Sequence, residues 1–382
     1  MIYIDVSAAV HGRAGLGRYA ESLTRALVGR GGGGSGTQDR YGLFYNRERG
    51  IEPLSGLEHL PARTVALGYK PWRMAVWLGH LAGLGFDRLL PGGSLFHATE
   101  HLLLPLRAMP TVLTVHDLIF RHLPQHHKRL NRWYLNLALP LYCRRAEHII
   151  AISECTRRDL SAAYHLDRDS ITVVPEAADP RFGPQPAERV EAVRRRYGLP
   201  DRYLLFVGTI EPRKNLPRLL KAFETLHGEG LTEGLVVVGR RGWLYGDFFA
   251  ALETSPVREA VCLPGFVPDA DLPAVYSGAQ ALAFPSLYEG FGLPVLEAMA
   301  CGTPVACSGT SSLPEVGGDA ALYFDPDDDE SLVGTLRRLL GDAELQQELV
   351  QRGRAQAAGF SWDRVAAETQ AVYERGMGKG AE

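Results

Sequence analysis

Two adjacent cations in the second half of the chain could hold a diphosphate. Arg213 and Lys214 stand in the run GTIEPRKN, which follows an apolar, strand-like segment and precedes a helical pattern that starts near residue 216. The N-terminus of a helix has free backbone N–H groups, so two cations at that point complete a site for phosphate oxygens. Gly208 ends the strand-like segment and lets the backbone turn there. Taken alone, the run would serve equally well as an ordinary basic loop.

A pair of carboxylates in a later glycine-rich run could hold a sugar. Glu289 lies in a loop in which Gly290 and Gly292 let the backbone approach a ligand. Pro294 fits the first turn of a helix that would carry Glu297 about one and a half turns in. Carboxylates that face vicinal hydroxyls make charge-assisted hydrogen bonds, which is how proteins usually hold sugars. Two solvated glutamates are the plainer alternative.

Two weaker candidates lie in the first half. His116 ends the strand-like segment 111–117, where it could bind a hydroxyl or move a proton near neutral pH, or be a structural histidine. Gly15 and Gly17 match the GxGxxA fingerprint of dinucleotide-binding sites. The match is weak for two reasons. The segment between the first strand and these glycines is longer than the tight turn of the fingerprint, and the second strand does not end in an acidic residue. A loop of this kind could still close over a phosphate.

The run GFVPDADL offers a further contact for a nucleotide. The backbone of Val267 could meet a base, and Phe266 could pack beside it. The same run would serve equally well as a plain turn into a helix capped by Asp269.

Short apolar runs alternate with helical patterns along the chain, which is typical of parallel sheets with crossover helices. We therefore predict an α/β fold with two doubly wound sheets. The predicted strands are 2–6, 41–46, 64–67, 94–99, 111–117, 148–153 and 171–175, then 203–209, 235–239, 260–265, 281–286, 304–309 and 321–325. The main helices of the first half are 17–28, 125–145 and 155–164, a glycine-rich loop is expected at 31–36, and a last helix should begin after Ser361.

Composition indicates a globular protein of two domains. The 382 residues are 46% apolar and 22% charged, which excludes a disordered chain, and the proline-rich stretch 175–186 marks the boundary. Up to residue 180 there are 21 Lys and Arg against 16 Asp and Glu, whereas the remainder has 20 against 28, so the halves should face different ligands. The net charge of −3 argues against nucleic-acid binding. The five cysteines form no CxxC pair, so we expect free thiols. Neither a membrane span nor a signal peptide is visible in the sequence, so we expect a cytoplasmic location.

Together these segments resemble the retaining glycosyltransferases of the GT-B fold, in particular family 4, which includes many mannosyl- and glucosyltransferases. The similarity is strongest over residues 203–323 and weaker over 1–179, and its specific feature is the E-x7-E spacing of Glu289 and Glu297 combined with the runs GTIEPRKN and GFVPDADL. It implies two Rossmann-like domains that face each other across a cleft. The acceptor-side domain would be 1–180, with the helix 361–382 packed back on it, and the donor domain would be 181–360.

The resemblance also implies a role for each matching residue. Arg213 and Lys214 would bind the donor diphosphate, Glu297 the ribose and Glu289 the donor sugar, while His116 matches the family's cleft histidine and Gly15 and Gly17 its phosphate-side glycines. We therefore expect catalysis by His116, Arg213, Lys214 and Glu289, and donor binding by Gly15, Gly17, Gly208, Val267, Glu289, Gly290, Phe291, Gly292, Leu293 and Glu297. GDP-mannose is the expected donor, and UDP-glucose or another UDP-sugar is the alternative.

The chain departs from the family pattern after residue 175, where Glu176-Ala177-Ala178 replaces a common Asn-Gly turn. No DxD metal motif stands beside the sugar residues, and the acidic run 325–330 is expected to cap a helix, so we predict transfer without a metal or other cofactor. No side chain stands out as a covalent nucleophile, and retention through an oxocarbenium-like state is expected.

The sequence indicates less about the acceptor than about the donor. Segments 67–90 and 121–145 combine tryptophans with Lys and Arg, which would suit an anionic membrane surface and a glycan linked to polyprenyl diphosphate, although a solvated basic helix is an alternative. Two other function classes stay open at this point: an NAD-dependent oxidoreductase, and a scaffold that binds sugar nucleotides without catalysis.

Overall fold

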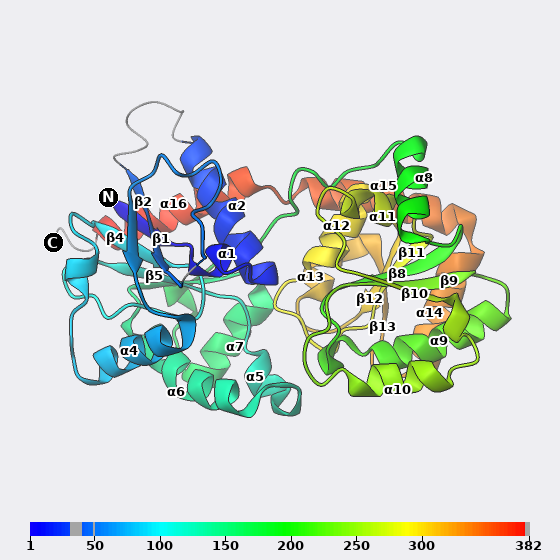
Figure 1. Cartoon of the computed structure of the whole chain (residues 1–382), viewed down its shortest axis with the longest axis horizontal. Helices are drawn as coiled ribbons and strands as arrows, with labels where there is room; N and C mark the ends of the chain where they lie inside the picture. The colour runs from blue at the N-terminus through cyan, green and yellow to red at the C-terminus, as the bar shows by residue number, and fades with distance from the viewer. Residues whose placement is uncertain (31–39, 49, 379–382) are drawn as a thin grey trace. The chain divides into compact units, whose positions relative to one another are not determined.

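The computed structural model describes residues 1–30, 40–48 and 50–378, so the expected loop at 31–36 lies outside the described residues. The chain forms two compact units (Figure 1). The first comprises residues 1–122, 127–176 and those from 361 on, and the second comprises 123–126 and 177–360. The polypeptide passes from one to the other after Glu176, within the proline-rich stretch.

The first unit is built on a parallel sheet of seven strands in the order β3-β2-β1-β4-β5-β6-β7. The strands are β1 (Ile2–Asp5), β2 (Tyr41–Asn46), β3 (Ala62–Val65), β4 (Leu95–Ala98), β5 (Thr111–Val115), β6 (His148–Ala151) and β7 (Ile171–Val173). The helices that alternate with them are α1 (Ser7–Val10), α2 (Ala14–Arg30), α4 (Tyr69–Leu81), α5 (Ile119–His122), α6 (Arg129–Arg145) and α7 (Glu154–Tyr164). The central strands are buried along their whole length, as expected for a sheet covered on both faces.

The second unit has a parallel sheet of six strands in the order β10-β9-β8-β11-β12-β13. These strands are β8 (Tyr203–Val207), β9 (Gly234–Val238), β10 (Val261–Gly265), β11 (Ala281–Phe284), β12 (Val305–Ser308) and β13 (Ala321–Phe324). Its helices are α8 (Ala187–Tyr197), α9 (Leu216–Gly228), α10 (Gly246–Thr254), α11 (Leu272–Ser277), α12 (Leu293–Cys301), α13 (Leu313–Gly317), α14 (Asp329–Gly341) and α15 (Ala343–Ala358). In each sheet the strand order reverses once, between β1 and β4 and between β8 and β11, which is where ligands bind in open α/β sheets.

The last helix, α16 (Trp362–Gly378), belongs to the first unit (Figure 1). Ser361 caps it by accepting a hydrogen bond from the backbone N–H of Arg364 at 3.2 Å. The helix packs against α2, β4 and β5, and the buried hydroxyl of Tyr373 lies 2.7 Å from Nδ1 of His97. Side chains distant in sequence thus complete the core of this unit.

The predicted doubly wound α/β architecture is confirmed, and every predicted strand is present. The strand predicted at 64–67 is displaced, because β3 at the sheet edge pairs Ala62 with Leu43 of β2. The helix predicted at 125–145 begins only at Arg129, since Pro124–His126 forms a separate 3₁₀ turn. Asp328 caps α14 through the backbone N–H groups of Glu330 and Ser331, as the acidic run predicted. The five cysteines are free, and Cys262 alone among them is only half-buried.

Candidate active site

The turn after β8 presents Arg213 and Lys214 at the start of a helix, as predicted. Gly208 follows the strand, Pro212–Lys214 forms a single 3₁₀ turn, and α9 then begins at Leu216. Asn215 takes the left-handed conformation between the two helical segments, with a φ of 56°, which asparagine tolerates better than most residues. The backbone N–H of Gly208 donates to the carbonyl of Val238 at 2.9 Å, which fixes the turn to the neighbouring strand.

Both cations contact Glu289, which follows β11 on the other side of the strand reversal. Arg213 Nη1 lies 2.7 Å from Glu289 Oε2, and Lys214 Nζ donates to Glu289 Oε1. Arg213 also binds Glu211 at 2.6 Å, a carboxylate that the sequence analysis did not select although it stands in the same run. Lys214 and Glu289 are both buried, so the structure brings three of the predicted residues together in one cluster.

Each charge in this cluster depends on the others. Burial would raise the pKa of Glu289, but the positive charges of Arg213 and Lys214 outweigh it and lower the pKa to about 2. Burial and the nearby Arg213 lower the pKa of Lys214, and the opposing charge of Glu289 limits that shift. Glu289 is therefore a carboxylate over the whole neutral range. Such a cluster, with two cations held at the end of a strand, can exchange a carboxylate partner for a phosphate oxygen.

The helix that carries Glu297 starts as predicted. Gly292 precedes α12 with a φ of 117°, and Pro294 occupies the first turn. The conformation favours glycine, and a Cβ on Gly292 would also displace the methyl group Cδ2 of Leu313, which would lie 2.7 Å away. Glu297 is buried and accepts a hydrogen bond from the hydroxyl of Tyr276 at 2.8 Å.

The loop before this helix is held by two serines that sequence analysis missed. Ser312 donates from its hydroxyl to the carbonyls of Glu289 at 3.0 Å and Phe291 at 2.7 Å. Ser311 accepts from the backbone N–H of Glu289 at 2.9 Å. Gly290, in the same loop, is buried. Both serines follow the end of β12, where residues of a binding site are expected, but no spacing in the sequence links them to residue 289.

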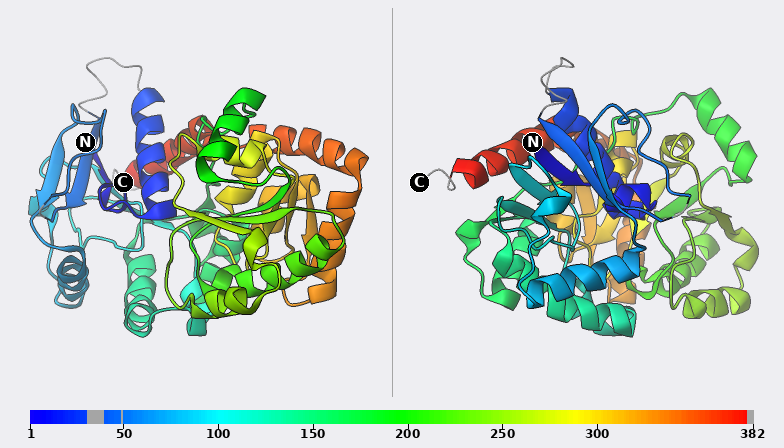
Figure 2. Two further views of the ribbon diagram at one scale, coloured as in Figure 1. Left: turned by 45° about the vertical axis from the view of Figure 1, so that its right-hand side comes forward. Right: turned by 60° about the vertical axis from the view of Figure 1, so that its left-hand side comes forward.

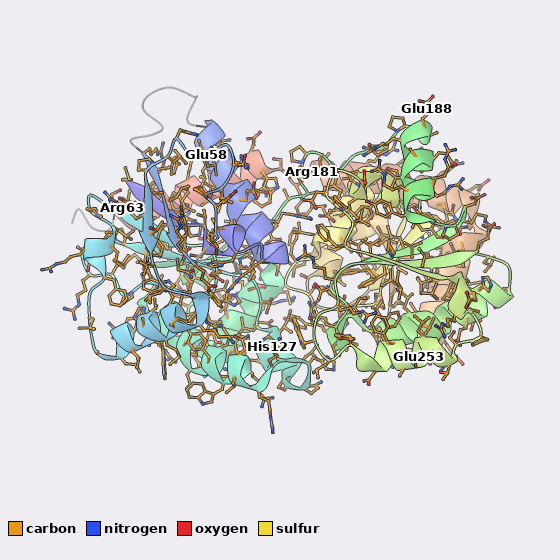
Figure 3. The ribbon with its side chains drawn as sticks, viewed as in Figure 1. Glu58, Arg63, His127, Arg181, Glu188 and Glu253 are labelled. Atoms are coloured by element: carbon orange, nitrogen blue, oxygen red, sulfur yellow. The ribbon has the colours of Figure 1, made fainter. Side chains whose placement is uncertain are left out.

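The run after β10 differs in part from its expected structure. Val267 is buried, whereas Phe266 is more than half exposed and lies under the guanidinium of Arg240, whose Cζ is 4.4 Å from the ring centroid. The alternative in which Asp269 caps a helix is wrong, because α11 begins at Leu272 with Asp271 at its N-cap. Asp269 instead binds Arg181 at 3.4 Å, a residue labelled in Figure 3.

Gly15 and Gly17 do not lie in a loop, which corrects the sequence prediction. α1 follows β1 at once and α2 begins at Ala14, so both glycines fall in the first turns of α2. A Cβ on Gly17 would lie 2.8 Å from the carbonyl oxygen of Ala8, whereas a Cβ on Gly15 would meet open space. Gly17 therefore allows α2 to pack closely on α1. A role for either glycine in binding a donor phosphate stays a prediction.

These two glycines should respond differently to the same substitution. Gly17→Ala is expected to destabilise the chain by about 1–3 kcal/mol because the new methyl group overlaps backbone. Gly15→Ala should raise helix stability by up to about 1 kcal/mol, since alanine is the better helix former. Urea unfolding of the two variants measures both effects. Equal stability of the two variants would contradict the packing role of Gly17.

His116 is buried at the end of β5, with both ring nitrogens next to oxygen acceptors. Nδ1 lies 3.2 Å from Oε1 of Glu176, and Nε2 lies 2.8 Å from the carbonyl oxygen of Thr99. Burial alone would lower the pKa of His116, but the hydrogen bond and charge of Glu176 outweigh it, so the pKa is raised. When the ring is protonated, its two N–H groups can donate to both acceptors. Glu176, the residue that departs from the family pattern, is therefore the partner of this histidine.

Glu176→Gln is expected to lower the pKa of His116, because burial then acts without an opposing charge. A raised histidine pKa stabilises the fold below the unfolded-state value of about 6.5, and this contribution is lost as pH rises through the folded-state pKa. The variant should therefore lose stability mainly at acidic pH. Histidine NMR titration measures the shift, with His122 as internal control, since its pKa is raised by the hydrogen bond to Asp159 and not by Glu176. An unchanged titration of His116 would contradict this assignment.

Two further findings concern metal sites and membrane spans among the described residues. They contain no group of three or more His, Cys, Asp and Glu side chains arranged to hold a metal ion. Within the same residues, no helix combines the length and the apolar character needed to cross a membrane.

Comparison with known proteins identifies the family. The family model described as glycosyl transferases group 1 matches residues 190–356, and that of glycosyltransferase family 4 matches residues 13–182. The chain is 34% identical over 273 residues to O-antigen chain mannosyltransferase B of Escherichia coli, covering 71% of this chain and 72% of that protein. It is 32% identical over 262 residues to the serotype-specific mannosyltransferase WbdA of Escherichia coli, which covers 66% of this chain but only 32% of the longer WbdA protein.

Solved structures support the same fold. Sucrose-phosphate synthase from Thermosynechococcus elongatus superposes with a TM-score of 0.78 at 19% identity, over 98% of both chains. Anabaena Alr3699/HepE, solved in complex with UDP and glucose, gives a TM-score of 0.73 at 16% identity, over 98% of this chain and 99% of that one. Together with the matched family models, these similarities show that the chain belongs to family 4 of the glycosyltransferases and is a sugar-transferring enzyme of the GT-B fold.

Proposed function

We propose that the enzyme transfers mannose from GDP-mannose to a hydroxyl group of a glycan, with retention of configuration and without a metal ion. The cluster of Arg213, Lys214 and Glu289 at the strand reversal of the second unit carries this proposal. The names of two relatives, both O-antigen or serotype mannosyltransferases from Escherichia coli, support mannose as the sugar. An NAD-dependent oxidoreductase is excluded by the family.

In this mechanism the donor diphosphate exchanges with Glu289 as the partner of the two cations. Arg213 and Lys214 then neutralise the charge that develops on the departing nucleoside diphosphate, and backbone N–H groups at the start of α12 add to this stabilisation. Glu289, released from the cations, accepts hydrogen bonds from hydroxyls of the donor sugar. Glu297, further along α12, holds the ribose.

The remaining proposed contacts come from backbone groups. Phe291, Gly292 and Leu293 would offer N–H groups to the sugar or the phosphate, and Val267 would contact the base. The acceptor hydroxyl attacks from the face that the diphosphate leaves, through an oxocarbenium-like state, and its proton passes to an oxygen of the departing diphosphate. No protein nucleophile is required. The catalytic role of His116 stays a prediction, and its two hydrogen bonds favour a positioning role over proton transfer.

Thermal-shift measurements with GDP, UDP, ADP and NAD test the donor. Stabilisation by GDP above the others supports the proposal, and subsequent mannose transfer from GDP-mannose distinguishes an enzyme from a silent scaffold. UDP-glucose is the second candidate, because the similar Anabaena HepE structure contains UDP and glucose. Stabilisation by UDP alone would replace the first donor with the second. An inverted anomeric configuration in the product, read by NMR, would overturn retention.

We also propose that the enzyme meets its acceptor at an anionic membrane surface. All eight exposed large hydrophobic residues described in the first unit lie between positions 67 and 137. Six of them form two stripes, here called the α4–α6 face: Met74, Leu78 and Leu81 on α4, and Leu130, Trp133 and Leu137 on α6. The spacing of three and four residues places each stripe on one side of its helix. Trp77 and Trp133 join the stripes with ring centroids 5.9 Å apart, and the two helices lie side by side in Figure 2.

The charges around this face match an anionic partner. Segments 67–90 and 121–145 contain nine Lys and Arg residues and one acid, Asp87. That acid is occupied by the backbone N–H groups of Arg107 at 2.9 Å and Ala108 at 2.7 Å. Leucine and tryptophan flanked by cations insert well at the boundary of acyl chains and anionic headgroups.

Sedimentation with vesicles tests the face. The enzyme should sediment with phosphatidylcholine vesicles that contain phosphatidylglycerol, and a variant with Leu130, Trp133 and Leu137 all changed to Ser should not. Leu263→Ser, at an exposed leucine of the second unit, is the matched control and should sediment like the wild type. Lack of lipid-dependent sedimentation, or a dimer in ultracentrifugation that the triple variant abolishes, would overturn the proposal.

A further inference from the structure

Three adjacent strands of the first unit end in buried oxygens without a hydrogen-bond partner. Asn46 is the last residue of β2, Asp5 is the last of β1, and Glu100 follows two residues after β4. These strands are neighbours in the order β2-β1-β4, and all run in parallel, so the three side chains share one edge of the sheet. Among the described residues, nothing donates to Asn46 Oδ1, Asp5 Oδ2 or Glu100 Oε1.

Each of these side chains is anchored by its other polar atom. Asp5 Oδ1 accepts from the backbone N–H of Ser7 at 2.8 Å, and Asn46 Nδ2 donates to the carbonyl of Leu67 at 3.0 Å. Glu100 Oε2 accepts from Arg13 Nη1 at 2.7 Å. One polar atom of each side chain, an oxygen in Asp5 and Glu100 and the amide nitrogen in Asn46, is thus held in place. The remaining oxygen is left unpaired, which costs free energy for a buried group and is rare without a ligand or ordered water.

The charges at this edge are unbalanced. Asp5 and Glu100 are both fully or almost fully buried, and Arg13 is the cation that binds Glu100. Burial and the negative charge of Glu100 raise the pKa of Asp5 to about 7, while hydrogen bonds from Ser7 and the charge of Arg13 act against the shift. The edge is therefore rich in acceptors and poor in donors, so it favours a partner that supplies O–H groups.

Two side chains next to these strand ends are suited to contact a sugar. The guanidinium Cζ of Arg13, a side chain one quarter exposed, lies 3.3 Å from the ring centroid of Tyr69, and that ring is half-buried. Arg13 directly precedes α2 and Tyr69 begins α4, so both side chains come from helix starts beside the ends of the strands. The position also coincides with the reversal of strand order between β1 and β4, where open α/β sheets bind ligands.

We propose that Asp5, Asn46 and Glu100 bind hydroxyl groups of the acceptor sugar. The ligand class is a polyhydroxylated glycan end, whose adjacent O–H groups donate to the three unpaired oxygens. Arg13 and Tyr69 cover the bound sugar. This inference rests on the proposed function, since it concerns the acceptor side of the same sugar transfer, and it names three residues of the expected acceptor-side domain that no sequence motif singled out.

Kinetics with methyl α-D-mannoside as the acceptor probe and GDP-mannose as the donor test this assignment. Asp5→Asn and Glu100→Gln keep side-chain size but replace an accepting oxygen by a donating amide, so each should raise the KM for the probe at least about tenfold. GDP-mannose hydrolysis without acceptor, and the thermal shift produced by GDP, should stay at wild-type values. Glu147→Gln, an exposed carboxylate just before β6 at the opposite edge, is the matched control.

Glu297→Gln gives the opposite pattern and separates the two sites. It should weaken GDP binding and leave the KM for methyl α-D-mannoside unchanged. If wild-type enzyme neither binds GDP nor hydrolyses GDP-mannose, the proposed donor is wrong. Binding of methyl α-D-mannoside to the acceptor site is then measured by ligand-observed NMR, which needs no donor.

A second measurement does not depend on the folding of any variant. Monodeoxy analogues of methyl α-D-mannoside are tested on wild-type enzyme, and at least one should bind about tenfold or more weakly, because its missing hydroxyl leaves a buried oxygen unpaired. Where Glu100→Gln folds, the same analogue and the parent probe should bind it alike. Equal binding of all analogues to wild-type enzyme, or an unchanged KM in both Asp5→Asn and Glu100→Gln, would overturn the proposal.

Discussion

Lys214→Ala is expected to lower the kcat for sugar transfer by at least about 100-fold. The ammonium group is buried beside Glu289 and Arg213, at the place where charge develops on the departing diphosphate. Removing one such preorganised group typically costs this much or more in rate, because water cannot replace it in a buried site. Initial-rate kinetics with saturating donor and acceptor measure the loss.

The fold should survive this change, since Glu289 keeps Arg213 as its partner. Lys214→Met, which keeps most of the side-chain volume, separates lost charge from lost packing and should be as inactive as Lys214→Ala. Lys221→Ala is the matched control, because Lys221 is a mostly exposed lysine on α9 that binds Asp329. Near-normal turnover in either variant of Lys214 would contradict its place in the mechanism.

Gly239→Ala is expected to prevent stable folding of the second unit. Gly239 follows β9 with a φ of 151°, which residues with a side chain rarely adopt. An added Cβ would overlap the carbonyl oxygen of Gly208, and backbone on both sides leaves neither atom free to move. We expect a loss of more than about 3 kcal/mol in unfolding free energy, from steric overlap and backbone strain together.

Chemical unfolding followed by circular dichroism measures this loss. Gly246→Ala is the control, since Gly246 begins α10 and a Cβ there would meet nothing within 4 Å. A Gly239→Ala protein as stable as Gly246→Ala would contradict this expectation, because the backbone at Gly208 and Gly239, just after β8 and β9, would then relax more easily than their close contact implies.

Much of the fold could be predicted from sequence, because both sheets are built from short apolar runs separated by helices. The errors occur where local pattern is weak. β3 is an edge strand with exposed Arg63 and Thr64, so its limits depend on pairing with β2 rather than on its own hydrophobicity. α4 was not predicted, because tryptophans and cations on one helix obscure the usual apolar period.

The candidate site was predictable to the level of strand ends but not of contacts. Arg213 and Glu289 follow β8 and β11, which are neighbours in the sheet although three strands apart in the chain, and only the strand order brings them together. Gly15 and Gly17 were misplaced, because α1 fills the space expected for a loop. Asp5 and Glu100 escaped notice because isolated acids at strand ends carry no motif, and their unpaired oxygens are visible only in three dimensions.

Calorimetric titration with GDP and guanosine tests the central claim most directly. If Arg213 and Lys214 grip the diphosphate, wild-type enzyme binds GDP far more tightly than guanosine, and Lys214→Met lowers the affinity for GDP at least about tenfold while guanosine binds as before. Equal affinity of wild type and Lys214→Met for GDP would contradict the account, because the phosphates would then be held somewhere other than the turn that follows β8.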